Sequence, residues 1–186
     1  MFFFRVGHSY HGRRIRSQRL DCGFTLIELM VTVVLLAIMV NMVMPLGQLA
    51  EGFKLDYVNQ RIYSSAVLAK SEAIKRSSTV SVCRSTNGTS CDTGPDWSDG
   101  WVVFVNPNGN NSIDPGEDVI RVFSPIRSPV TFSWDSGQLL TFLSRGSPVS
   151  QGTFTLCPAT ARVVPERQVT VSGSGLIRKR EGANCL

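Results

Sequence analysis

The sequence predicts an α+β protein in which one long N-terminal helix packs on antiparallel β-sheets. The uncharged run from Leu29 to Ala50 is 22 residues long, enough for a helix that crosses a membrane. Small and apolar residues then recur at helical spacing as far as Ala73. After Thr79 the chain consists of short β-prone runs separated by Gly, Pro, Asn, Asp and Ser. Together these patterns favour an α+β fold with one globular domain.

The first half of the expected helix carries one carboxylate. At 1.5 Å per residue, residues 24–45 would form a helix of about 33 Å, close to the thickness of a bilayer core. Glu28 lies near the start of this helix, and a charge in hydrocarbon is costly and usually functional. Glu28 therefore needs a partner. A cut between Gly23 and Phe24 would supply one, the new α-amino group of Phe24.

The second half of the helix is expected to continue beyond Gly47, with an end near residues 77–79. Apolar side chains recur there at spacings of three and four, while the charged residues fall largely off this stripe. The stripe consists of Leu55, Val58, Ile62, Ala66, Ala69 and Ala73. One face of this half is therefore predicted to pack on the globular domain.

Eight short strands are predicted after the helix. They cover residues 80–83, 100–105, 119–123, 130–134, 139–143, 153–156, 168–171 and 175–178. The run from Trp101 to Val105 is continuously apolar, so we expect the helix to cover one of its faces and a second sheet the other.

The N-terminal motif resembles a known processing site. Residues 23–28, Gly-Phe-Thr-Leu-Ile-Glu, look like the cleavage site of type IV prepilins and type II secretion pseudopilins, and Pro45 stands where those proteins often carry a helix-loosening proline. The rest of the chain resembles the FimT/GspH group of minor pilins at residues 69–76, 99–104 and 169–172. The resemblance covers most of the chain after residue 23 and implies a type IV pilin-like fold.

The resemblance also implies a function and a location. A prepilin peptidase would remove residues 1–23 and methylate Phe24, and Glu28 would guide assembly into a filament. Residues 24–50 would form the transmembrane and filament-core helix, and residues 51–186 the periplasmic domain of a single-pass inner-membrane protein. The expected partners are the peptidase, the inner-membrane assembly platform and other pilins or pseudopilins. The implied function is that of a structural or priming subunit of a type IV pilus or a type II secretion pseudopilus.

Two other interpretations of the N-terminus are an ordinary secretory signal and an uncleaved membrane anchor. A secretory signal usually has an apolar core of 7–15 residues followed by small residues at the cut. Here the run is longer, and a cut after Ala50 would place Gln48 where a small residue is expected. Residues 1–23 carry five arginines against one acid, Asp21, which predicts that this end stays in the cytoplasm.

The cysteines predict disulfides. Removal of the leader takes Cys22 away and leaves four cysteines in an exported domain, so two disulfides are expected. Three pairings are open. We favour Cys83 with Cys91, which closes a short loop, and Cys157 with Cys185, which ties down the C-terminal segment. Zinc is disfavoured because there is no CxxC pair and no histidine after the leader.

Neither an enzyme nor a cofactor is expected. His8 and His11 lie in the leader, and the remaining chain has no Gly-rich phosphate loop or nucleophile elbow. A serine–lysine arrangement stays open, although nothing in the sequence points to one.

The loop at residues 106–117 has features of a calcium-binding loop. Its Asn, Ser, Asp and Glu residues fall at positions 1, 3, 5, 7, 9 and 12 of a calcium-loop spacing. Position 1 is Asn106 instead of Asp, and position 6 is Asn111 instead of Gly. An Asn/Gly-rich hairpin turn is the alternative, and it is the commoner use of such a stretch.

The C-terminal third is basic and is the candidate nucleic-acid surface. Some FimT-type pilins bind DNA during natural transformation through a motif that resembles Gly-Arg-x-Arg, and here residues 175–178 read Gly-Leu-Ile-Arg. The candidate residues are Arg162, Arg167, Arg178, Lys179 and Arg180. Phosphate contacts alone would be weak and salt-sensitive. A solvated face that balances the acidic half of the domain is the alternative interpretation.

Overall fold

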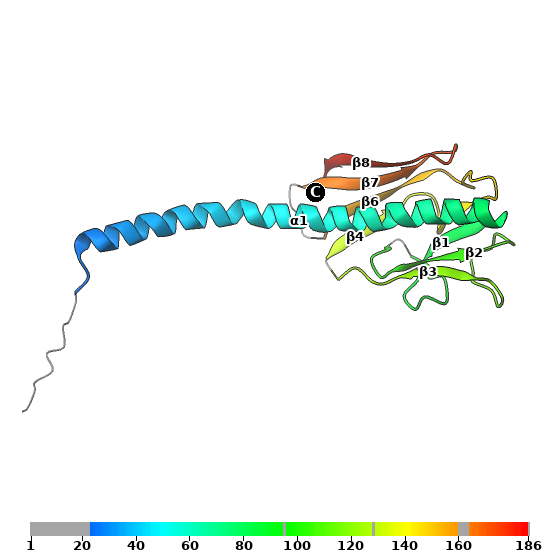
Figure 1. Cartoon of the computed structure of the whole chain (residues 1–186), viewed down its shortest axis with the longest axis horizontal. Coiled ribbons are helices and arrows are strands. Elements are labelled where there is room, and N and C mark those ends of the chain that lie inside the picture. Colours follow the sequence, from blue (N-terminus) through cyan, green and yellow to red (C-terminus); the bar gives the residue numbers. More distant parts are fainter. Residues whose placement is uncertain (1–22, 95, 128, 160–163, 186) are drawn as a thin grey trace, which may run out of the picture. The chain divides into compact units, whose positions relative to one another are not determined.

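A computed structural model describes residues 23–94, 96–127, 129–159 and 164–185, without the side chains of residues 41–51. The chain divides into two compact units, residues 1–42 and 43–186. The described residues form one helix and then eight strands along the chain, as the colours of Figure 1 show. The sequence prediction of an α+β fold is confirmed.

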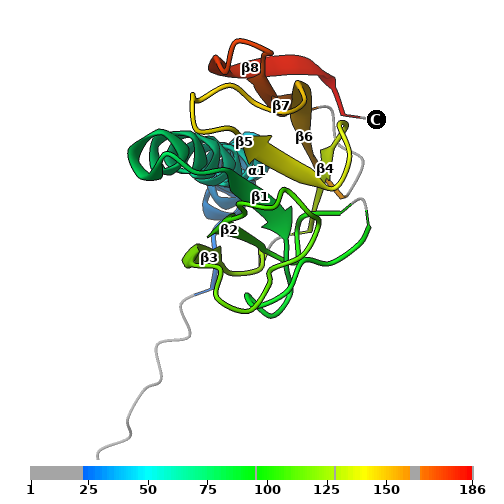
Figure 2. The same cartoon turned by 90° about the vertical axis from the view of Figure 1, so that its right-hand side faces the viewer.

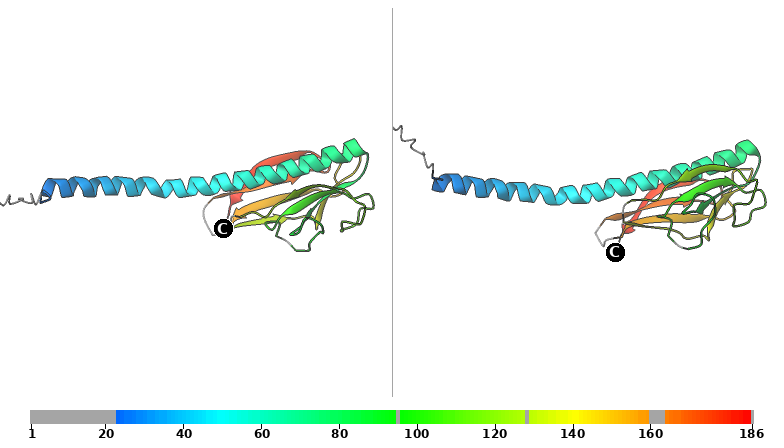
Figure 3. Two further views of the ribbon diagram at one scale, coloured as in Figure 1. Left: turned by 60° about the horizontal axis from the view of Figure 1, so that its bottom comes forward. Right: turned by 90° about the horizontal axis from the view of Figure 1, so that it is seen from below.

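Helix α1 runs from Leu26 to Arg76. The six residues of the predicted stripe are all at most 1% exposed, so this face of α1 packs into the core. Figure 3 shows the sheets against one side of the C-terminal half of α1. At the C-terminus, Ser77 adopts a positive φ of 49°, and the amide of Ser78 donates to the carbonyl oxygen of Ala73 at 3.2 Å. This is a Schellman-type end, here with Ser in the position that Gly usually takes.

The strands form two antiparallel sheets of four. The first has the order β3-β2-β1-β5 and the second the order β4-β6-β7-β8. The strands are β1 (Val80–Arg84), β2 (Trp101–Val105), β3 (Val119–Phe123), β4 (Val130–Trp134), β5 (Leu139–Phe142), β6 (Gly152–Pro158), β7 (Pro165–Val171) and β8 (Ile177–Asn184). β3 and β8 are edge strands, and both lie at the outside in the end view of Figure 2.

The main core lies between α1 and the inner faces of both sheets. Trp97, Phe132 and Phe154 form a buried aromatic cluster, with the ring centroids of Trp97 and Phe154 5.0 Å apart. Trp101 on β2 is fully buried, and its Nε1 donates to Oγ of Ser65 on α1 at 2.8 Å. The hydrogen bond satisfies a buried indole N–H and fixes the helix against the first sheet.

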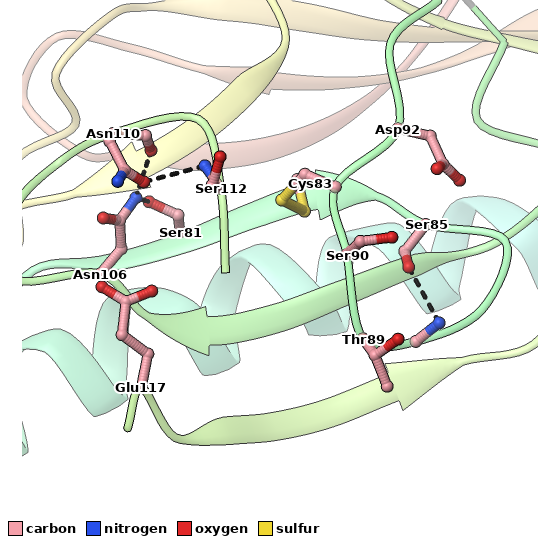
Figure 4. The surroundings of a disulfide bond; sticks show 12 residues. Ser81, Cys83, Ser85, Thr89, Ser90, Asp92, Asn106, Asn110, Ser112 and Glu117 are labelled. Carbon is pink, nitrogen blue, oxygen red and sulfur yellow. Dashed lines mark hydrogen bonds between the residues drawn. A yellow bond between two sulfur atoms is a disulfide. The ribbon is translucent and has the colours of Figure 1, made fainter. Parts of the chain in front are cut away.

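The expectation that a second sheet covers one face of β2 is wrong. Val102 and Phe104 are buried, but they pack with Cys83, Cys91 and Ile113 rather than under a second sheet. The loop closed by the Cys83–Cys91 disulfide and the β2–β3 loop therefore cover this face (Figure 4). The sequence could not distinguish the two covers, because an apolar run shows only that both faces are buried.

The second disulfide joins Cys157 on β6 to Cys185, just after β8. Both disulfides have the pairing that we favour from the sequence. β8 extends to Asn184, six residues beyond the predicted end at residue 178. The charged run at residues 178–181 is not typical of a buried strand, but an edge strand tolerates it because both faces reach solvent there.

Candidate functional site

The expected processing site lies in exposed chain just before α1. Gly23 and Phe24 precede the helix, and Phe24 is 77% exposed. A Cβ built at Gly23 would have no atom within 4 Å. In the described chain, nothing covers the bond between these residues. A peptidase can therefore reach this bond outside the helix.

Thr25 caps α1, a role that was missed in the sequence interpretation. The amide of Glu28 donates to Oγ1 of Thr25 at 3.3 Å, which satisfies one of the free amides at the helix start. The available signal was the spacing Thr-x-x-Glu, that of a capping box. The helix thus begins two residues after the expected cut, and Glu28 lies in its first turn. A carboxylate is favoured there by the positive end of the helix dipole.

The described side chains of residues 23–40 are all exposed. Large apolar residues dominate, from Leu26 at 78% exposed to Val40 at 59%. Apolar surface of this extent marks a site of interaction with protein or membrane. Within the described part of the chain, no helix combines the length and hydropathy of a membrane span.

The structure separates the candidate nucleic-acid residues. Side chains alternate along β8, and Ile177 packs against the core. Lys179 therefore lies on the face toward α1, and Arg178 and Arg180 lie on the opposite, outer face of the sheet. Arg162 is outside the described residues.

The two cations on the helix side have local partners. Nε of Arg167 lies 2.6 Å from Oδ1 of Asp56, and its Nη1 lies 3.3 Å from Oε1 of Glu181. Nζ of Lys179 donates to Oε1 of Gln60 at 2.8 Å. Arg178 and Arg180 have no such ion pair among the described residues. Arg178, Lys179 and Arg180 are all exposed, but only Arg178 and Arg180 lie together on the outer face of the sheet.

The loop at residues 106–117 connects antiparallel neighbours β2 and β3, as a hairpin does. Nδ2 of the fully buried Asn106 donates to Oγ of Ser81 and to the carbonyl oxygen of Asn110 (Figure 4). Oδ2 of Asp114 accepts from the side-chain Nδ2 of Asn108 and of Asn110, both at 2.7 Å. The last two bonds occupy a carboxylate oxygen that calcium would need. Among the described residues, no group of three or more His, Cys, Asp or Glu could hold a metal.

Comparison with known families decides the class of the chain. Residues 59–175 match the family model described as type II transport protein GspH, which covers more than half of the chain. Residues 18–41 match the prokaryotic N-terminal methylation motif, which includes the expected cut at Gly23.

The chain belongs to the GspH family.

Solved structures agree with this fold. The type IV minor pilin FimU of Pseudomonas aeruginosa is 20% identical with a TM-score of 0.58, over 74% of this chain and 99% of FimU. The minor pseudopilin EpsH of Vibrio cholerae is 14% identical with a TM-score of 0.50, over 69% of this chain and 97% of EpsH. No curated protein matches this chain.

This GspH-family chain is a minor pilin or pseudopilin, a structural and non-enzymatic class of protein. Its methylation motif implies processing by prepilin peptidase, and its family implies assembly with other pilins. The chain is accordingly an inner-membrane prepilin that later enters a pilus or pseudopilus.

Proposed function

We propose that prepilin peptidase cuts this chain between Gly23 and Phe24 and methylates the new Phe24 terminus, after which the chain primes or builds a filament. The observation that carries this proposal is the order of local structure. An exposed, non-helical Gly23–Phe24 bond is followed at once by the Thr25 cap and by Glu28 in the first helical turn. The bond is accessible, while the assembly residue is already held on the helix.

The proposed leader is residues 1–23, the membrane and filament-core helix is residues 24–50, and the globular domain is residues 51–186. The domain lies in the periplasm while the precursor waits in the inner membrane as a single-pass protein. Two observations support this orientation. The leader carries five arginines, which favour the cytoplasm, and the domain contains two disulfides, which form in oxidising compartments.

Assembly moves the helix from lipid into the filament core with the help of the platform in the inner membrane. Glu28 of one subunit pairs there with the methylated Phe24 amine of a neighbour. Each charge is costly alone in an apolar core, and pairing offsets that cost and fixes the axial register. In the described chain Glu28 is exposed and makes no ion pair, so its carboxylate is accessible to a neighbour.

The test of processing is the mass of the chain isolated from its host cells. We expect a chain that starts at Phe24 and carries one extra methyl group. Gly23→Leu should leave the precursor uncut. The matched control is Gly52→Leu, which makes the same change in α1 at a glycine that also has open space around its Cβ. Wild-type chain that still starts at Met1 in filaments, or a chain trimmed beyond Ala50, would contradict the proposal.

DNA binding is the second function that the sequence suggested. Its surface centres on Arg178 and Arg180 on the outer face of β8, since Arg167 is ion-paired with Asp56, while Lys179, although exposed, lies on the opposite face. Two phosphate contacts would give weak binding with only a shallow dependence on salt, because the slope scales with the number of contacts. No observation in the described chain favours this function over assembly.

A further inference from the structure

The unit of residues 43–186 contains a groove whose side chains have no role in the proposed processing or in the proposed assembly through the N-terminal half of α1. It has a volume of about 830 Å³ and lies between residues 53–61 of α1 and residues 121–127, which comprise the end of β3 and the segment after it. Both walls belong to the compact unit of residues 43–186.

The groove exposes large apolar side chains. Phe53 is 70% exposed and Tyr57 65%. Two such rings, one helical turn apart beside one hollow, differ from the scattered single apolar residues that are normal on a protein surface. Rings of this size supply the anchors of many interfaces, because each buries a large area at a small cost in side-chain entropy.

Three arginines surround this apolar surface. Arg61, Arg121 and Arg127 line the groove, and none of its described lining residues carries a carboxylate. Asp56, on the same helix, instead bonds Arg167 of β7. The groove is therefore positive as well as apolar, although the domain as a whole carries both signs of charge. An occupant with carboxylates would complement it.

Two of the arginines are held in place. Cζ of Arg61 lies 4.8 Å from the centroid of the Trp101 ring, and its Nη2 donates to the carbonyl oxygen of Ser124 at 2.7 Å. Cζ of Arg121 lies 5.2 Å from the centroid of Phe123. Stacked guanidinium groups keep donors directed outward and lose less entropy when they bind a carboxylate.

The neighbouring sheet edge indicates what kind of occupant fits. β3 is hydrogen-bonded to β2 on one side and is the edge strand of its sheet. Figure 2 shows it at the outside of the domain. An extended peptide can add to such an edge through main-chain hydrogen bonds while its side chains enter the groove. Single-stranded nucleic acid would also suit rings and arginines, but it gains nothing from a strand edge.

We infer that this groove binds an acidic, extended segment of a neighbouring pilin subunit, with its carboxylates on Arg61 and Arg121 and an apolar side chain against Tyr57. This inference rests on the proposed function, because it takes the partner from the same filament. The inference adds a lateral contact between globular domains to the proposed contact between the N-terminal halves of the α1 helices.

The test places a photo-cross-linking amino acid at Tyr57 in the full-length chain inside its host cells. The control position is Val149, which is 63% exposed and does not line the groove. We expect Tyr57 to capture a segment of another processed pilin subunit that contains at least two Asp or Glu residues. Val149 should not capture that segment.

Charge reversal tests the chemistry. Arg121→Glu should lower the yield of this cross-link at least about fivefold. Changing an acid of the captured segment to Lys should restore it. Arg178→Glu makes the same change on the far sheet and should leave the yield unchanged. A non-reducing gel that shows both disulfides verifies that each variant folds.

Four outcomes would overturn the inference: no capture at Tyr57, capture of nucleic acid or lipid, capture of a segment without carboxylates, or a cross-link yield that Arg121→Glu does not change. The mass of the chain from the same cells separates the two failures. If no Phe24 terminus is found, the proposed function fails. If the terminus is found but the groove captures nothing, only the lateral contact fails.

Discussion

The hydrogen bond between Trp101 and Ser65 should contribute measurably to the stability of the globular domain. Both residues are fully buried, and Oγ of Ser65 is the acceptor for the indole N–H at 2.8 Å. Ser65→Ala removes that acceptor and leaves a buried donor unsatisfied, which costs about 1–3 kcal/mol. The higher helix propensity of Ala offsets about 0.5 kcal/mol of this loss.

A second serine on the same helix isolates the effect. Ser71 is exposed, and its Oγ donates to a backbone carbonyl one turn earlier, as that of Ser65 also does. Ser71→Ala carries the same gain in propensity without the buried donor. We therefore expect Ser65→Ala to be less stable than Ser71→Ala by about 1–3 kcal/mol.

Urea unfolding followed by tryptophan fluorescence measures this difference in the full-length chain in detergent. The chain has three tryptophans, and all three are buried in the core of the domain, so the signal reports the domain and not the stem. Adding Trp101→Phe to both chains should remove the penalty of Ser65→Ala, since no indole donor remains. Equal stability of the two serine variants, within about 0.5 kcal/mol, would refute the reasoning.

Four further outcomes follow from the same geometry. Glu28→Leu should leave cleavage after Gly23 intact but prevent entry into filaments; normal entry, measured by immunoblot of sheared filaments, would contradict the ionic pairing. Removing the 28-residue link by Cys157→Ala with Cys185→Ala should lower the free energy of unfolding by about 3 kcal/mol in the chain-entropy model, and an unchanged urea midpoint would oppose that estimate. Arg76 lowers the pKa of Glu72 through a hydrogen bond. The ionised Glu72 therefore stabilises the folded domain at pH values above the ordinary pKa of a glutamate, and this contribution is lost as the pH falls through the lowered pKa. The free energy of unfolding of Glu72→Gln, measured in urea across this acid range, should depend less on pH than that of wild type. Any mobility shift of short duplex DNA should disappear in Arg178→Ala with Arg180→Ala and persist in Lys179→Ala, and the reverse order would reject the outer face of β8 as the DNA surface.

The elements that sequence predicts well are those whose burial follows a simple period. The stripe from Leu55 to Ala73 is buried at every position, because a helix that packs on a sheet turns the same face toward the sheet at each turn. β3 and β4 have the predicted bounds for a similar reason, since turn-forming residues flank each of them.

The features that sequence did not reveal depend on contacts between distant segments. Which of two covers lies over Val102 depends on where the Cys83–Cys91 loop folds, and an apolar run does not encode this. The basic residues near the C-terminus looked like one patch, yet strand alternation sends Lys179 toward α1 and its neighbours outward. The groove between α1 and β3 joins residues 60 or more positions apart, so no local motif could indicate it.

The motif at residues 23–28 is best understood as a boundary between two kinds of chain. A peptidase needs an extended substrate, whereas a filament core needs a helix, and the change occurs at Thr25. Because Thr25 caps the helix, Glu28 is held in the first turn, close to where the proposed cut would leave the new amine. In the filament that we propose, the acid would meet the neighbouring subunit from an ordered backbone, and less conformational entropy would be lost when the ion pair forms. Thr25→Ala separates this contribution from the charge itself. It keeps both ions but removes the cap, at a cost of about 1 kcal/mol in helix stability, and should slow filament entry less than Glu28→Leu does. Entry as poor as that of Glu28→Leu would mean that the hydroxyl, and not the carboxylate, controls assembly.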